Sequence, residues 1–432
     1  LNMQASKTLI NDTSGNLKLI IATTIGSIFE IFDFIAFVFL SPILAELFFP
    51  KELASKAIWF TYLTIAISYL LRPIGGIILG HLGDKYGRKT VFSISILLMS
   101  IPSLLIGIMP TYASIGYFAT GILIFMRILQ GFSVGGEVPG SITYIAEKFK
   151  HANYFFACAW LTFGANFAVS IGSQSIRLLT EYTSHEFMLS IGWRIPFIFG
   201  SLLTIIGFYI RKSISESEAY QQIQRQKQQT KIPLLELLHS YRYPVISGIL
   251  LAIIVSLTTS IFHVFLPNLF VTYFHFELSQ TAGISSAGAI TMALASLLFA
   301  YLTKYINPIT ILQGSLVILA LIFAGISFNL ISLATINNLY LWVIIISFFL
   351  AGINGLFFAL LADLFPTQVR YSGVAVCYNI AYIFGAGITP LWTSSILEIT
   401  HSYHYISLVC LLIASISLIN SFNIKKLTHY PN

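Results

Sequence analysis

Charged side chains are scarce in this chain of 432 residues. Asp, Glu, Lys and Arg together make up 9% of it, whereas apolar residues make up 56%. Soluble globular domains carry about 25% charged residues. The composition therefore excludes a water-soluble globular protein and indicates an integral membrane protein.

Cysteine is also scarce, and its positions form no pattern. The chain has three cysteines, Cys158, Cys377 and Cys410, all inside long apolar runs at unrelated spacings, which supports neither a disulfide framework nor a thiolate metal site. The sequence further lacks a metal-ligand spacing, a nucleophile elbow and a glycine-rich phosphate loop. We therefore expect no enzyme, no cofactor and no metal.

Long apolar runs dominate the chain instead. A helix needs about 20 apolar residues to cross a membrane, and these continuous runs lack the period-two alternation of barrel strands. Residues 1–16 are polar and no cleavage site follows the first run, so we expect the first helix to be retained. We predict an all-α membrane protein with twelve transmembrane helices, near residues 17–47, 58–81, 90–109, 114–146, 153–179, 193–211, 244–273, 280–303, 309–329, 336–361, 371–397 and 402–424.

Basic residues lie mainly on one side of this predicted topology. Among the 23 Lys and Arg, the exceptions are Arg72 and Arg127 within runs, and Lys51, Lys56, Arg177 and Arg194 at or near the far side. All the others fall on the side of the amino terminus. An excess of Lys and Arg marks cytoplasmic connectors, so we expect both termini in the cytoplasm and the protein in a bacterial inner membrane. This topology accounts for the net charge of +7. We therefore expect the lipid bilayer, and no nucleic acid, as partner.

The longest polar interval divides the chain near its midpoint. It predicts an N-terminal six-helix half (1–211), a cytoplasmic central loop (212–243) and a C-terminal six-helix half (244–432). The string YIAEKF at 144–149 is echoed half a chain later by LLADLF at 360–365, and secondary transporters are often built from such repeats, with the substrate site between them. The same offset maps the first half's charges onto neutral residues: Asp33 onto Ile249, Arg72 onto Gly288, Asp84 onto Ala300 and Arg127 onto Val343.

A few ionisable residues fall inside the predicted helices. Each costs about 2.5–3.5 kcal/mol in hydrocarbon when charged, so each needs a reason. Glu30 and Asp33 are three residues apart and share a helix face, while Arg72 and Arg127 lie at comparable depth in the second and fourth helices. Two close carboxylates in a low dielectric do not both ionise easily, which suits a site that loads and releases a proton. We predict proton coupling or substrate contact for these four and for His263 in the seventh helix.

The same residues also have a purely structural interpretation. An ion pair of Glu30 or Asp33 with an arginine would hold helices together. Arg72 and Arg127 are equally suited to balancing charge and to contacting substrate or the proton carrier. His263 fits a hydrogen-bonded interior residue as well as a transport residue.

The segment GHLGDKYGRKT at 80–90 is predicted to be a hairpin between the second and third helices. It resembles the corresponding loop of the major facilitator superfamily, whose pattern is Gly, three residues, Asp, a base, any residue, Gly, Arg, a base. The segment RILQGFSVGGE at 127–137 is similar to that family's arginine-containing helix motif. The resemblance implies two six-helix halves that rock to give alternating access. Every position of the loop pattern is matched, by Gly80, Asp84, Lys85, Gly87, Arg88 and Lys89.

Further strings resemble the metabolite:proton symporter family within that superfamily. They are FEIFDF at 29–34, LRPIGG at 71–76, GFSVGGE at 131–137, GWRIPF at 192–197 and LFPTQVRYSG at 364–373. This family includes proline/betaine, 2-oxoglutarate, citrate and shikimate carriers. The resemblance implies a secondary active transporter that couples a proton to a small zwitterionic osmolyte or an organic acid.

The resemblance also implies a cytoplasmic latch built on the hairpin. Asp84 is expected to cap a helix amino terminus across the interface of the halves, and Arg88 to pair with Glu137 or Glu216. Glu216 is the position to which ISESEAY at 214–220 maps the family's acid. The counterpart in the second half, YLTKYINP at 301–308, keeps Lys304 but has no Asp, so the latch is expected to be one-sided.

The substrate class stays open between osmolyte and carboxylate. Intramembrane arginines favour an anionic group, whereas aromatic residues either pack in the core or embrace a quaternary ammonium by cation–π contact. Two other functions remain: an antiporter that exports drugs or metabolites, and a membrane sensor without net flux. The aromatic candidates are Phe29, Phe32, Tyr378 and Tyr382.

Overall fold

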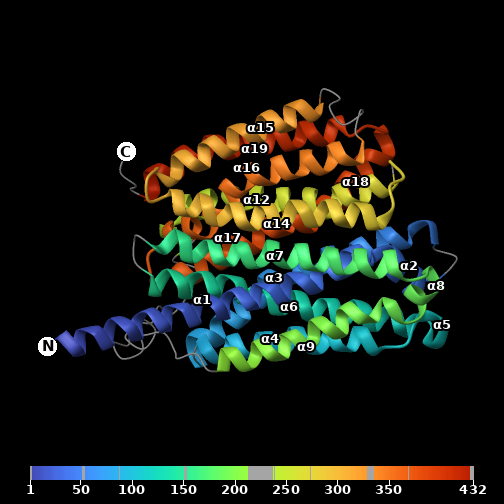
Figure 1. Ribbon diagram of the computed structural model, residues 1–432, viewed down its shortest axis with the longest axis horizontal. Coiled ribbons are helices and arrows are strands. Elements are labelled where there is room, and N and C mark those ends of the chain that lie inside the picture. The colour runs from blue at the N-terminus through green and yellow to red at the C-terminus, as the bar shows by residue number, and fades with distance from the viewer. Residues whose placement is uncertain are drawn as a thin grey trace.

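The computed structural model is a bundle of long helices (Figure 1). It describes residues 2–50, 54–86, 88–149, 153–212, 237, 239–272, 274–327, 335–367 and 369–428. The first half contains α1 (Asn2–Phe39), α2 (Ser41–Phe48), α3 (Ala54–Tyr86), α4 (Arg88–Ile108), α5 (Tyr112–Ile115), α6 (Tyr117–Lys148), α7 (Tyr154–Tyr182), α8 (His185–Phe187), the π-helical segment η3 (Met188–Gly192) and α9 (Arg194–Lys212). The second half contains α12 (Arg242–Ser260), π-helical η4 (Ile261–Phe265), α13 (Leu266–Thr272), α14 (Leu278–Leu302), α15 (Pro308–Ser327), α16 (Ile336–Asp363), α17 (Arg370–Tyr382), π-helical η5 (Ile383–Gly387), α18 (Thr389–Thr400) and α19 (His404–Thr428).

The apolar runs of the sequence form the membrane-spanning helices. Within the described residues, 11 helical segments are long and apolar enough to cross a bilayer, and the shorter apolar segment Ile94–Ile108 completes the set. The prediction of an all-α protein with twelve transmembrane helices is therefore confirmed.

The structure refines the approximate limits of the predicted helices, most clearly in the first two. The first run, 17–47, is not one helix, because α1 ends at Phe39 and α2 begins at Ser41 with Pro42 in its first turn, where proline's missing N–H is tolerated. The second helix does not end at residue 81 but continues to Tyr86. The residues of the predicted hairpin up to Tyr86 are thus helical, and α4 begins at Arg88.

The two halves lie side by side in the bundle. In Figure 1 the first half, in blue and green, forms the lower part and the second half, in yellow to red, forms the upper part. Both chain termini lie at the same end of the bundle, which we call the terminal end. The halves meet where α7 packs on α14 and α16, and where α17 packs on α3 and α6.

Glycine brings α3 and α6 into close backbone contact. A Cβ atom added to Gly131 would lie 2.2 Å from the Ser68 carbonyl oxygen, and one added to Gly135 would lie 1.9 Å from the Arg72 carbonyl oxygen. Small residues allow such an approach in membrane helices. This contact fixes Arg72 of α3 and Arg127 of α6 relative to each other.

Candidate functional site

A central cavity lies between the two halves. Residues of α1, α3, α6 and α7 line it from the first half, and residues of α12, η4, α16, α17, η5 and α18 line it from the second. Its volume of about 80 Å³ is enough for roughly six water molecules, at ~10–15 Å³ each, or for one small solute of that size. Its charged lining residues are Glu30 and Arg72, both from the first half, and the second half contributes His263, Tyr378 and Tyr382.

Arg72 lies against aromatic rings at the edge of this cavity. Its guanidinium carbon is 4.0 Å from the ring centre of Tyr69 and 5.9 Å from that of Tyr382. Glu30 and Arg72 are 3% and 5% exposed, so both charges are held in a low dielectric. Tyr69 was not predicted, although its position three residues before Arg72 places it on the same face of α3.

The aromatic residues of the second half form a stack beside Arg72. The ring centres of Tyr378 and Tyr382 are 4.1 Å apart, and Tyr378 also stacks on Phe357 at 6.5 Å. All three line the central cavity. The aromatic prediction is therefore correct in its placement of Tyr378 and Tyr382 at the site.

The other two predicted aromatic residues do not line the cavity. Phe29 packs where α1 meets Gly207 of α9. Phe32 makes an edge-on contact with Phe199, with ring centres 5.8 Å apart, and it lies next to Gly172. Both face neighbouring helices within the first half, which agrees with the core-packing alternative for these two residues and not with contact to a ligand in the central cavity.

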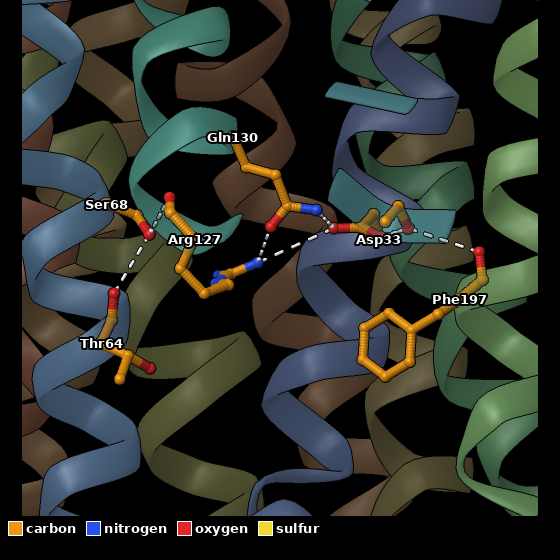
Figure 2. A network of polar contacts seen from close by, with 7 residues as sticks. Asp33, Thr64, Ser68, Arg127, Gln130 and Phe197 are labelled. Atoms are coloured by element: carbon orange, nitrogen blue, oxygen red, sulfur yellow. Dashed lines mark hydrogen bonds and ion pairs between the residues drawn. The ribbon is translucent and has the colours of Figure 1, made fainter. Parts of the chain in front are cut away.

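Asp33 lies inside the first half, in a hydrogen-bonded network with Arg127. The Gln130 amide nitrogen donates to Asp33 Oδ2 at 2.8 Å, and Arg127 donates to Gln130 Oε1 at 2.9 Å. The Arg127 guanidinium is also 3.7 Å from Asp33 Oδ2, while the Ser103 hydroxyl donates to Asp33 Oδ1. Figure 2 shows Gln130 between the two charged groups. Ser103 was not predicted, and Gln130 was noted only as part of a motif.

A side cavity beside this network shares lining residues with the central cavity. Glu30, Asp33, Arg72, Arg127 and Gln130 all line it, and Glu30 and Arg72 line the central cavity as well. Its volume of about 20 Å³ is enough for one or two water molecules, at ~10–15 Å³ each. The four predicted charges are therefore brought together, with Glu30 and Arg72 toward the central cavity and Asp33 and Arg127 behind them.

His263 lines the central cavity from η4. It is 3% exposed, and among the described residues neither of its ring nitrogens has a hydrogen-bond partner. The interpretation of His263 as a hydrogen-bonded interior residue is therefore wrong in this structure. Both η4 and η5 contribute to the cavity wall, and π-helical segments are frequent at functional sites, but no sequence pattern predicted them.

The three cysteines lie outside the central cavity. Cys158, Cys377 and Cys410 are buried and free, and none of them lines the central cavity. Across the described ranges, no group of three or more His, Cys, Asp and Glu side chains gathers as a metal site would.

Four hydrogen bonds cross the interface between the halves on the side of the terminal end. In each, a side chain of one half donates to a backbone carbonyl of the other. None of the four donors was predicted. They are Tyr154 to Ala359 at 3.2 Å, Thr162 to Asn354 at 2.9 Å, Tyr371 to Gly136 at 3.1 Å and Asn379 to Gly135 at 2.9 Å.

The predicted latch lies largely outside the described residues. Glu137 is buried in α6, next to the Gly136 carbonyl that accepts from Tyr371. The latch residues not described are Gly87 and Glu216 entirely, and Gly80, Asp84, Lys85, Arg88 and Lys89 in their side chains. Their roles stay predictions.

Comparison with known proteins identifies the family. A family model of the Major Facilitator Superfamily matches residues 25–390. The chain belongs to this superfamily. It is 30% identical to the proline/betaine transporter of Salmonella typhimurium, over 98% of this chain and 86% of that one. It is 29% identical, over the same shares, to the proline/betaine transporter of Escherichia coli K12.

Solved structures share the fold at low sequence identity. A proton:xylose symporter bound to 6-bromo-6-deoxy-D-glucose has a TM-score of 0.75 and 14% identity, with 96% of each chain covered. The xylose transporter of E. coli in a partially occluded inward-open conformation has a TM-score of 0.74 and 14% identity, covering 97% of this chain and 100% of that one. The predicted family is thus confirmed, and this membrane protein is a secondary transporter rather than an enzyme.

Proposed function

We propose that this transporter is a proton-coupled symporter of a small zwitterionic solute. The observation that carries the proposal is the side cavity, because Glu30 and Arg72 of the central cavity line it together with Asp33 and Arg127. Coupling requires that each ligand change the binding free energy of the other. A proton site one or two waters away from a substrate site meets that requirement.

The charges of the central cavity favour a zwitterion over the other candidate substrates. The Arg72 guanidinium is suited to a carboxylate, and the Glu30 carboxylate is suited to a cationic nitrogen. A di- or tricarboxylate would bring further negative charge toward Glu30. A cavity of about 80 Å³ also fits a small osmolyte better than a bulky drug. The relatives named above are proline/betaine transporters, whose solutes belong to this class.

Asp33 is the proposed proton site. In its ionised form it holds the Arg127 guanidinium and the Gln130 amide. Protonation removes the negative partner of Arg127, so the electrostatic potential in the side cavity rises beside Glu30 and Arg72. The proton and the solute then bias the same rocking equilibrium, each by its different affinity for the two states.

We further propose that the terminal end faces the cytoplasm of a bacterial inner membrane. Lys148, Arg242, Lys304 and Arg370 lie at or near that end of their helices, as the excess of Lys and Arg in cytoplasmic connectors requires. In this orientation the four hydrogen bonds donated by Tyr154, Thr162, Tyr371 and Asn379 lie on the cytoplasmic side of the interface.

Transport into proteoliposomes tests the proposal. The full chain is reconstituted, a pH gradient is imposed with the lumen alkaline, and uptake of labelled proline, betaine, 2-oxoglutarate, citrate and shikimate is measured with and without a proton ionophore. We expect gradient-driven accumulation of a zwitterion that the ionophore abolishes. Accumulation of carboxylates alone, outward flux of bulky cations alone, or binding without flux would each contradict the proposal.

A substitution at Arg72 tests the substrate site directly. Arg72→Lys keeps the positive charge but loses the planar pair of donors that matches a carboxylate, so we expect the KM for the zwitterion to rise about tenfold. Arg177→Lys is the matched control, since Arg177 lies in an exposed pair with Glu181. An unchanged KM in Arg72→Lys would mean that the carboxylate of the solute does not bind at Arg72.

A further inference from the structure

The serine and threonine hydroxyl groups that line the central cavity donate their protons to main-chain carbonyls. Thr162 donates to the Asn354 carbonyl at 2.9 Å, and Thr259 donates to the Val255 carbonyl at 2.8 Å. Ser260 donates to the Ala386 carbonyl at 3.2 Å. A hydroxyl has one proton and two lone pairs. Toward a ligand these three side chains therefore offer only acceptors.

The two asparagines that line the central cavity also donate to main-chain carbonyls and leave acceptors for a ligand. Asn166 donates from its amide nitrogen to the Thr162 carbonyl at 2.9 Å, and Asn354 donates to the Leu350 carbonyl at 3.2 Å. Each keeps its amide oxygen, which accepts two hydrogen bonds. Together with the Glu30 carboxylate, they make a cavity wall that is rich in acceptors, with Arg72 as its cationic donor.

His263 adds an acceptor without a partner. A neutral imidazole has one donor nitrogen and one acceptor nitrogen, and within the described part of the chain neither nitrogen is hydrogen-bonded. A buried polar group left unpaired destabilises the protein. A ligand N–H that reached the acceptor nitrogen would offset this destabilisation.

Four aromatic rings of the cavity already have a neighbour against at least one face. The Arg72 guanidinium lies over Tyr69 at 4.0 Å. Tyr378 and Tyr382 stack on each other, and Phe357 stacks on Tyr378. A quaternary ammonium binds best over a free ring face, because the ring edge carries positive potential. The stack therefore gives such a cation little of the surface that it needs.

We propose that the central cavity selects zwitterions whose cationic nitrogen carries N–H groups over zwitterions with a quaternary nitrogen, and that His263 accepts one of these N–H groups. This proposal rests on the proposed function and narrows its substrate class. Amino and imino acids can donate hydrogen bonds to Glu30, to His263 and to the three hydroxyl oxygens described above. A trimethylammonium group has no proton to donate to any of these acceptors, and within the described residues it leaves the His263 ring nitrogens without a hydrogen bond.

A graded ligand series tests the selection in the unmodified protein. Proline, N-methylproline and N,N-dimethylproline share one ring and carry two, one and no N–H groups at neutral pH. Each competes with labelled proline for uptake by proteoliposomes that contain the full chain. Since a hydrogen bond to a charged group contributes about 1.5–3 kcal/mol, we expect the inhibition constant to rise about tenfold or more from the first ligand to the last. Equal inhibition by all three, or stronger inhibition by N,N-dimethylproline, overturns the proposal.

Variants of His263 test its assignment as the acceptor. His263→Phe keeps a flat ring and removes both nitrogens, so the preference for proline over N,N-dimethylproline should shrink about fivefold or more, while N,N-dimethylproline is still bound. His263→Gln restores an amide oxygen and should recover part of the preference. His185→Phe is the matched control, because His185 is 70% exposed at the far end of the bundle. An unchanged preference in His263→Phe removes His263 from the proposal.

The outcomes separate this proposal from the function on which it rests. If the chain accumulates only carboxylates, the proposed function fails before the series is informative about N–H groups. If all three proline ligands compete equally under a pH gradient, symport of a zwitterion stands and the selection for N–H fails. Because the ligand series uses the unmodified protein, its inhibition constants do not depend on whether any variant folds.

Discussion

The two halves of the bundle pair their second and fourth helices in the same way but place different chemistry on them. In the first half, Gly135 of α6 packs on the Arg72 carbonyl of α3. In the second half, a Cβ on Gly355 of α16 would lie 2.6 Å from the Ser296 carbonyl oxygen of α14. Close glycine contacts thus hold both pairs. By the offset of half a chain, Arg72 falls on Gly288 and Arg127 on Val343, so both halves have a glycine contact between these helices but only the first has the charges.

The comparison shows which half contributes the charged residues of the two cavities. Glu30, Asp33, Arg72 and Arg127 all belong to the first half. The second half contributes neutral groups: the His263 imidazole, the tyrosine stack, and the Tyr371 and Asn379 side chains that donate across the interface. We infer that the first half carries the proton and the charged ends of the solute, while the second half completes the cavity and closes one side of it.

Removing the charge of Asp33 is expected to have the largest effect. Asp33→Asn leaves the buried Arg127 without its ionic partner, and breaking a buried pair on one side costs about 3–5 kcal/mol. Proton-driven accumulation should be abolished, while exchange of labelled for unlabelled solute across proteoliposomes persists. The measurement compares uphill uptake with exchange in the same vesicles.

Glu181→Gln supplies the control for Asp33→Asn, since Glu181 is an exposed acid in an ion pair of the same half. Normal uphill accumulation in Asp33→Asn would show that the proton binds elsewhere. It would then contradict the inference that the first half carries the proton through Asp33.

Filling the glycine contacts should weaken both halves to a similar degree. Gly135→Ala and Gly355→Ala each force a methyl group against a carbonyl oxygen of the neighbouring helix, and overpacking of this kind costs about 1–3 kcal/mol. Gly121→Ala and Gly314→Ala are the matched controls, one per half, because a Cβ at either position meets nothing within 4 Å. The measurement is the thermal unfolding midpoint in detergent.

The comparison of the scaffolds depends on that result. If Gly135→Ala unfolds at a clearly lower temperature and Gly355→Ala does not, the two helix pairs are not equivalent scaffolds.

Much of the fold followed from the sequence because the bilayer restricts what an apolar run can do. Runs of sufficient length had to become helices, and charges such as Asp33 and Arg127, at mid-depth in their runs, had to find partners there. The residues that complete the site were harder to predict. Ser103 and Gln130 are ordinary polar residues in the sequence, and only the approach of α1, α4 and α6 reveals that they hold Asp33.

The direction of an aromatic side chain was the weakest prediction. Phe29 and Phe32 lie beside Glu30 and Asp33 in the sequence, yet a helix turns by 100° per residue, so neighbours along the chain point in different directions. Tyr378 and Tyr382 are four residues apart and stack on one face of α17. The π-helical turns η4 and η5, which shift this register at the cavity, have no sequence pattern of their own.

Loosening the contacts that the second half makes across the interface should have a moderate effect. Tyr371→Phe removes the hydrogen bond to the Gly136 carbonyl, and such a bond contributes about 0.5–1.5 kcal/mol. The population that is open at the terminal end should therefore rise about fivefold. Distances between spin labels on the terminal ends of the two halves measure this population.

Tyr301→Phe controls for the loss of a hydroxyl group, because Tyr301 is exposed and its hydroxyl contacts only Tyr305 among the described residues. An unchanged distance distribution in Tyr371→Phe would mean that the second half does not hold this side closed through Tyr371.

The smallest effect is expected where a charge of the first half lies outside the cavities. Arg177 and Glu181 form a pair at 3.2 Å, with side chains 37% and 39% exposed, and exposed pairs contribute about 0–1 kcal/mol. Glu181→Gln should therefore leave proton-driven uptake unchanged and shift the unfolding midpoint by little. A loss of uptake as large as that of Asp33→Asn would contradict the contrast between the halves, because that contrast attributes function to the burial of charges beside the cavities and not to their number in the first half.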